Sequence, residues 1–132
     1  MGLILDTCIL IEAERKKNAI DFSIWAHHGA AYISTITVSE LLLGVHHADT
    51  KARQLKRSVF VEGILSHIPA LDFTTETARI HAEIYAHLAK KGKVIGAHDL
   101  IIAATALAHD CSLLTMNQNE FNRVPGLTVL TL

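Results

Sequence analysis

Cysteine is scarce in this 132-residue chain, and its placement limits the chemistry available. The two cysteines, Cys8 and Cys111, form no C-x-x-C pair, which argues against a disulfide framework and against a cysteine zinc site. Nine histidines are present, but the adjacent pairs at 27–28 and 46–47 would point in different directions from a helix and do not predict a metal site. We interpret the cysteines as small buried residues in a reducing compartment.

Long apolar runs are also missing. No run approaches the ~20 residues that span a bilayer, and the N-terminus has no basic segment followed by an apolar signal core. We therefore expect a cytoplasmic protein with no membrane partner.

The chain has neither a large net charge nor many aromatic residues. The formal net charge is -1, so any binding to nucleic acid must rely on a local basic patch rather than on the field of the whole protein. Aromatic residues make up 5% of the chain, so base stacking is not expected to be the main source of affinity for RNA.

Apolar residues, by contrast, make up half of the sequence, enough for a real core in one compact domain over residues 1–132. Short apolar runs alternate with longer helical patterns, which predicts a three-layer α/β/α fold around a central parallel sheet of four to five strands. The expected strands are Leu3–Leu5, Ala31–Ser34, Ile68–Phe73, 112–115 and Leu127–Leu130. The expected helices are Ile9–Lys17, Ala19–His28, Thr35–His47, Asp49–His67, Thr74–Lys91 and 98–110.

The opening stretch GLILDTCIL places an acid directly after a short apolar run. Such a run is typical of a strand buried on both faces, and ligands of parallel sheets collect at the carboxyl ends of the strands. Asp6 is therefore a candidate site residue. It is equally compatible with a simple N-cap of the following helix.

Two further acids lie at the starts of expected helices. Glu40 follows Thr37 by three residues, which is the spacing of a capping box, and Asp99 lies in the first turn of the helix expected to be most buried. The helix dipole favours an acid there, but an isolated carboxylate beside a core segment is costly unless it has a partner or a cation. If the sheet is parallel, Asp6, Glu40 and Asp99 face one edge.

Four segments carry a resemblance to a known family: LDTCILIE, TITVSELLLGV, IGAHDLIIAATALAHDCSLLTMN and EFNRVPGL. In this order and spacing they resemble the PIN-domain ribonucleases, specifically the toxins of VapC-type toxin–antitoxin pairs. The resemblance covers essentially the whole chain. It implies an endoribonuclease that uses Mg²⁺, for which Mn²⁺ can substitute, and that cuts structured RNA, by analogy a tRNA.

The resemblance also assigns the site. Asp6, Glu40 and Asp99 match the family's acidic triad, with Asp6 and Asp99 as direct metal ligands and Glu40 acting through a bound water. Thr115 matches a small hydroxyl residue near them. Asn117 occupies the place where many relatives have Asp, and Glu120 is the nearest acid, so the fourth polar position is open between these two.

The chemistry is consistent with these residue types. Phosphodiester hydrolysis needs an activated water and a neutralised leaving oxygen, and a divalent cation held by carboxylates supplies both. Mg²⁺ commonly uses only one or two protein carboxylates. Three converging carboxylates without a metal should repel each other and raise at least one pKa. No Ser/His/Asp order and no phosphate-binding glycine loop is present as a competing mechanism.

Basic clusters are the candidates for RNA contact. Lys90, Lys91 and Lys93 lead directly into the helix of Asp99, so they could neutralise phosphates along the approach. The alternative is that they form a solvated helix face. Two further clusters are Lys51, Arg53, Lys56 and Arg57, and Arg15, Lys16 and Lys17.

Partners follow from the resemblance. It implies a small cognate antitoxin in an apolar groove involving Ile9, Ile11 and Trp25, and a homodimer or higher even oligomer. A rival hypothesis is a non-catalytic binding module with the same fold. A phosphatase with Asp6 as nucleophile is disfavoured because Cys8 stands where the best-known class has a second acid.

Overall fold

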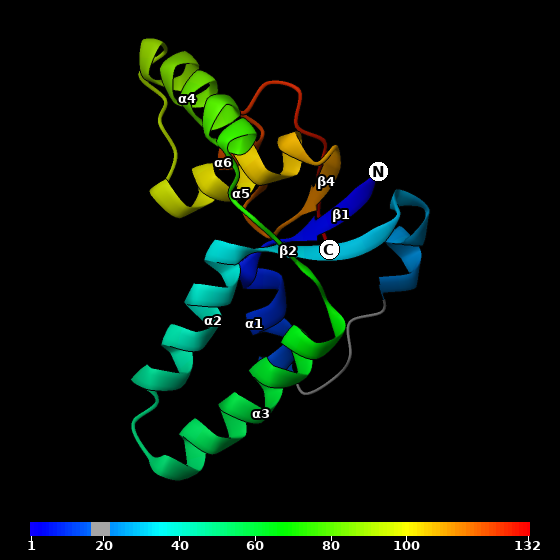
Figure 1. Cartoon of the computed structure of the whole chain (residues 1–132), viewed down its shortest axis with the longest axis vertical. Helices are drawn as coiled ribbons and strands as arrows, with labels where there is room; N and C mark the ends of the chain where they lie inside the picture. The colour runs from blue at the N-terminus through cyan, green and yellow to red at the C-terminus, as the bar shows by residue number, and fades with distance from the viewer. Residues whose placement is uncertain (17–21) are drawn as a thin grey trace.

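The computed structural model describes residues 1–16 and 22–132, and its centre is a five-stranded sheet in the order β3-β2-β1-β4-β5 (Figure 1). Every strand pair is parallel, as predicted. The strands are β1 (Gly2–Leu5), β2 (Ala30–Ser34), β3 (Ala70–Leu71), β4 (Cys111–Leu114) and β5 (Val129–Leu130). The described parts of the segments between them contain helices, as is usual for crossovers between parallel strands.

Helices cover both faces of the sheet, which confirms the predicted three-layer arrangement (Figure 1). One face carries α1 (Thr7–Lys16), α2 (Thr35–His47) and α3 (Lys51–His67), and the other carries α4 (Thr75–Lys90), α5 (Ala97–Ala108) and the short α6 (Gln118–Phe121). No helix among residues 1–16 and 22–132 is long and apolar enough to cross a membrane.

The central strand shows why both layers form. Along β1, Ile4 belongs to the core beneath α4 and α5, whereas Leu3 and Leu5 belong to the core beneath α1, α2 and α3. Successive side chains of a strand point to opposite faces, so an unbroken apolar run supplies two cores. Each such side chain contributes roughly 1.5–3 kcal/mol on burial. The strand is thus fixed from both sides, and so is the acid that follows it.

Some elements differ from the prediction. The helix expected over Ala19–His28 is a 3-10 helix over Phe22–His28, while residues 19–21 lie outside the described part of the chain. It ends, as predicted, at Gly29, whose φ of 101° is accessible mainly to glycine. The strand expected over Ile68–Phe73 pairs only at Ala70–Leu71, and α6 was not predicted.

Candidate active site

Asp6 lies at the carboxyl end of the central strand and is 5% exposed. Its Oδ1 accepts the backbone N–H of Thr7 at 2.8 Å, and its Oδ2 accepts the hydroxyl of Thr115 at 2.7 Å. Thr115 directly follows β4, which pairs with β1 in parallel, so the register brings these two residues together across 109 positions of sequence. Asp6 is therefore more than a helix cap, because a residue from the neighbouring strand also holds its carboxylate.

Glu40 reaches the same edge from α2. The hydroxyl of Thr7 donates to Glu40 Oε1 at 2.9 Å and lies 3.0 Å from the hydroxyl of Thr37, which is fully buried. The alternative interpretation of Thr37 and Glu40 as a capping box is therefore wrong. Ser34 is the N-cap of α2, and its Oγ accepts the Ile36 N–H at 3.2 Å. Because the helix begins earlier than a capping box requires, Thr37 and Glu40 are free to face Thr7.

Asp99 lies in the first turn of α5, and its surroundings raise its pKa from 3.8 to about 6. The largest cause is desolvation by burial. Next come the negative charge of Asp6, a hydrogen bond with Glu120, and the charges of Glu120 and Glu40. Each of these causes disfavours the ionised form. The direction agrees with the expected repulsion, and three carboxyl groups from other elements contribute to it at Asp99.

Both candidates for the fourth polar position adjoin Asp99. The amide Nδ2 of Asn117 donates to Asp99 Oδ2 at 3.5 Å, while the Asn117 backbone N–H donates to the Thr115 hydroxyl at 2.9 Å. Glu120, from the unpredicted helix α6, contributes through hydrogen bonding and charge to the raised pKa of Asp99. Asn117 therefore links Thr115 to Asp99, and Glu120 supplies the additional negative charge. We call the set Asp6, Glu40, Asp99 and Glu120 the acidic edge.

Three residues near the acidic edge were not predicted as part of it. Thr7 connects Asp6 to Glu40, as described above. His98 places its Nδ1 3.6 Å from Glu40 Oε2. Cys8, which the sequence suggested was a packing residue, donates its thiol to Asp6 Oδ2 at 3.2 Å. Thr7 and Cys8 follow Asp6 within two positions, and His98 directly precedes Asp99. This closeness to predicted acids was the only sequence signal for the three residues.

The donor chemistry of the acidic edge fits a hard divalent cation, because carboxylate, hydroxyl and amide oxygens are the ligands such ions prefer. In residues 1–16 and 22–132, however, no three histidine, cysteine or acidic side chains lie close enough together to surround an ion directly.

An apolar groove begins beside Glu40 and runs between α1, α2 and α3. Its volume is about 90 Å³, and its lining consists of Ile11, Glu14, Glu40, Leu41, Gly44, Arg57, Phe60 and Val61. Ile11 is 52% exposed, as a groove residue should be. The prediction that Ile9 and Trp25 line the groove is wrong, because both side chains are buried in the core beneath α1, α2 and α3.

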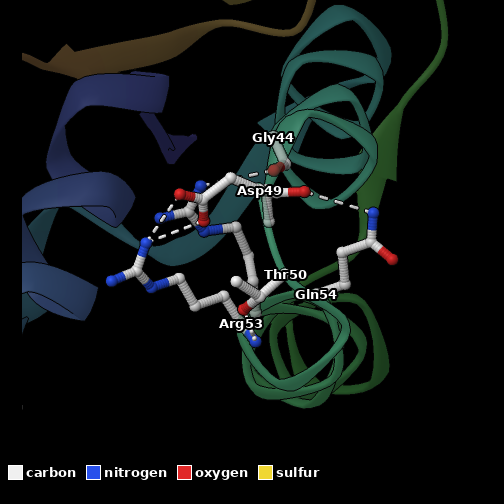
Figure 2. A network of polar contacts seen from close by, with 7 residues as sticks. Gly44, Asp49, Thr50, Arg53 and Gln54 are labelled. Carbon is white, nitrogen blue, oxygen red and sulfur yellow. Dashed lines mark hydrogen bonds and ion pairs between the residues drawn. The ribbon is translucent and has the colours of Figure 1, made fainter.

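A larger hollow of about 730 Å³ continues from this groove, and we call it the basic hollow. It shares Ile11, Glu14 and Arg57 with the groove, and it is further lined by Arg15, His47, Ala48, Asp49, Arg53 and Lys56. Figure 2 shows its rim at the turn between α2 and α3, where Arg53 Nη1 donates to both carboxylate oxygens of Asp49 at 2.7 and 2.8 Å. Thr50 caps α3 by accepting the Arg53 backbone N–H at 3.1 Å.

Arg57 crosses the boundary between the groove and the hollow. Its Nε lies 3.3 Å from Glu14 Oε1, and its Nη1 donates to the carbonyl of Gly44 at 3.3 Å. The arginine thus ties α3 to α1 and α2.

Lys90, Lys91 and Lys93 are all exposed at the end of α4 and in the loop that follows. None of the contacts described for these lysines involves a residue of the acidic edge, so their role in guiding RNA to the site stays a prediction. Arg123 was not singled out in the sequence, but it donates to the carbonyl of Val94 at 3.4 Å and so joins the segment after α6 to the same loop.

Comparison with known proteins adds a family to this geometry. Residues 3–127 match the family model described as the PIN domain. A protein named ribonuclease VapC1, from Rickettsia felis, is 44% identical over 131 residues, which are 99% of this chain and 96% of that protein. The chain belongs to the PIN-domain family, in its VapC branch.

Other VapC proteins resemble it over much of their length. A protein named tRNA(fMet)-specific endonuclease VapC, from Salmonella typhimurium, is 36% identical over 97 residues, covering 74% of this chain and 71% of that protein. The solved structure of VapBC2 from Rickettsia felis bound to a DNA fragment from their promoter has a chain that superposes with a TM-score of 0.89 at 28% identity, covering 100% of this chain and 99% of that one. The VapC resemblance seen in the sequence is confirmed.

Proposed function

We propose that this chain is a metal-dependent endoribonuclease toxin that hydrolyses phosphodiester bonds in structured RNA. The observation that carries the proposal is the convergence of Asp6, Glu40 and Glu120 on Asp99, strong enough to raise the Asp99 pKa to about 6, in a chain of the VapC branch. A tRNA is the proposed substrate because a relative carries a tRNA-specific name.

Each polar residue of the site has a separate proposed role. Asp6 and Asp99 would hold Mg²⁺, or Mn²⁺ in its place, and Glu40 would act through a bound water. When bound, the ion supplies an activated water and neutralises the leaving oxygen. Thr7 orients Glu40 by donating to Oε1, and Thr115 orients Asp6 by donating to Oδ2. Asn117 and Glu120 fix Asp99 from the side of α6.

Cleavage by matched asparagine variants tests this proposal. Asp6→Asn keeps the size of the side chain and removes the charge, so RNA cleavage with Mg²⁺ should fall by more than about 100-fold, the upper end of the loss seen on changing residues that only support metal ligands. Asp110→Asn is the control, because Asp110 precedes the other end of β4 and its φ of 53° suits asparagine. Equal cleavage by wild type and Asp6→Asn would refute the proposal.

The rival function, a non-catalytic binding module, makes the opposite prediction for the metal. It requires neither ion binding nor cleavage. Calorimetry with Mn²⁺ separates the two, because only the nuclease needs a saturable site that depends on Asp6 and Asp99.

We also propose a small antitoxin as the partner of the apolar groove and the basic hollow. The groove offers Ile11, Leu41 and Phe60 to apolar side chains, and the hollow offers Arg15, Arg53 and Lys56 to acidic ones. A segment that lies along both would end at Glu40, where a basic side chain would meet the acidic edge. A homodimer or higher even oligomer is likewise proposed from the family resemblance.

Ile11→Glu tests the antitoxin site. A charge on this exposed position of α1 should weaken antitoxin binding at least about tenfold, because an unpaired charge would be buried in the complex. Leu55→Glu, at a 68% exposed position of α3 that lines neither the groove nor the hollow, is the control. Unchanged binding by Ile11→Glu would place the antitoxin elsewhere.

A further inference from the structure

Cys8 lies between the acidic edge and the turn after β4 and contacts both. Its Sγ donates to Asp6 Oδ2 at 3.2 Å and accepts the backbone N–H of Met116 at 3.4 Å. The hydrogen-bond geometry thus makes the thiol a donor to the carboxylate and an acceptor from the backbone.

The two oxygens of Asp6 are unequally occupied. Oδ2 accepts from two groups, the hydroxyl of Thr115 at 2.7 Å and the thiol of Cys8 at 3.2 Å. Oδ1 accepts from the backbone N–H of Thr7 at 2.8 Å. A carboxylate oxygen has about two acceptor directions. Oδ2 is thus filled by these contacts, while Oδ1 keeps one direction open for a ligand.

We propose that Cys8 is a positioning residue that, together with Thr115, makes Asp6 a one-oxygen metal ligand through Oδ1. The inference rests on the proposed nuclease function and specifies how its metal is selected. Mg²⁺ and Mn²⁺ accept single oxygens in octahedral geometry, whereas Ca²⁺ readily takes both oxygens of one carboxylate. By occupying Oδ2, Cys8 disfavours the two-oxygen mode and therefore favours the smaller ions over Ca²⁺.

The second cysteine provides a matched control. Cys111 begins β4 at the opposite edge of the sheet, opposite Gly2 in the parallel register, and its thiol donates to the carbonyl of His109 at 3.5 Å. It is buried, whereas Cys8 is half-buried, and it has no described contact with the acidic edge. A general effect of removing a thiol from this protein would appear in both cysteine variants.

Calorimetric titration of Mn²⁺ and of Ca²⁺ into the full chain tests the proposal without relying on activity. Cys8→Ala should weaken Mn²⁺ binding about tenfold, the lower end of the effect of residues that support metal ligands, because a thiol is a weak donor. Ca²⁺ binding should weaken less, so that the Mn²⁺/Ca²⁺ affinity ratio falls. Cys8→Ser, which restores a donor, should recover the wild-type ratio, and Cys111→Ala should leave it unchanged.

Three results would overturn the proposal: Cys8→Ala binding both ions as Cys111→Ala does, an unchanged Mn²⁺/Ca²⁺ ratio, or no recovery in Cys8→Ser. Cys8→Val keeps the apolar volume without a donor and replaces the alanine variant if thermal unfolding shows that alanine disrupts the fold. Failure of the proposed nuclease function looks different, because Asp6→Asn would then bind Mn²⁺ as the wild type does.

Discussion

The acidic edge and the basic hollow are both rich in charge, but they balance it differently. At the rim of the hollow, Arg53 is paired with Asp49, and both side chains are more than two-thirds exposed. At the acidic edge, Asp6 is buried, and Asp99 is surrounded by groups of its own sign. Water and a counter-charge compensate the first pair, whereas no described counter-charge compensates Asp99, and we propose that a cation does so. Uncompensated charge near the core therefore identifies the functional region better than the amount of charge does.

The largest expected difference between the two regions concerns catalysis. Asp99→Asn should reduce Mg²⁺-dependent RNA cleavage more than about 100-fold, because it removes a proposed direct ligand rather than a supporting residue. Asp49→Asn makes the same chemical change at the hollow and should alter the rate less than about twofold, since surface changes away from special features have small effects. Initial cleavage rates on one tRNA substrate measure both. Similar losses of cleavage rate in the two variants would contradict the proposed difference between the acidic edge and the basic hollow.

A smaller effect is expected in the pH dependence of stability without metal. The folded state raises the Asp99 pKa from 3.8 to about 6, so in this interval it binds more protons than the unfolded state does. The contribution of Asp99 to the free energy of unfolding is therefore present at low pH and is lost as the pH rises from about 4 to about 6.

Urea unfolding from pH 3 to pH 8 measures this dependence. Asp99→Asn should flatten the decline, and Asp49→Asn should leave the wild-type curve in place. A wild-type protein that gains stability from Asp99 as the pH rises through this interval would contradict the sign of the shift.

The smallest effect is expected from the ion pair of the hollow. Arg53→Ala removes both hydrogen bonds to Asp49, yet it should lower the free energy of unfolding by only about 0.2–1 kcal/mol, as is usual for exposed pairs. The loss should shrink further in 1 M salt, where the screening length is about 3 Å. A loss of several kcal/mol would contradict this expectation, because the exposed pair would then contribute far more to the free energy of unfolding than such pairs usually do.

The sequence was most informative where local pattern and burial agree. The run Leu3–Leu5 predicted a strand buried on both faces, and the position of Asp6 followed from it. Thr35–His47 was predicted with the bounds that α2 has, yet the capping box inside it was wrong because Ser34 begins the helix. Spacing along one helix cannot reveal that Glu40 faces Thr7, 33 positions away.

Residues whose role depends on packing between elements were harder to predict. Ile9 and Trp25 were assigned to a surface groove from the family resemblance but lie in the core, and a 3.6-residue period could not correct this because it does not say which apolar stripe is covered by a neighbour. Cys8 appeared to be a packing residue, since nothing local indicates its contacts with Asp6 and with Met116, which is 108 positions away. Glu120 gained its place from α6, a helix of four residues that is too short for a periodic pattern.

The most direct test of the central claim is a calorimetric titration of Mn²⁺ into the wild type, Asp6→Asn and Asp110→Asn at neutral pH. If the acidic edge is a metal site, the wild type and Asp110→Asn bind Mn²⁺ with the same saturable affinity, and Asp6→Asn loses that binding. Equal Mn²⁺ binding by all three proteins, or no binding by the wild type, would contradict the claim.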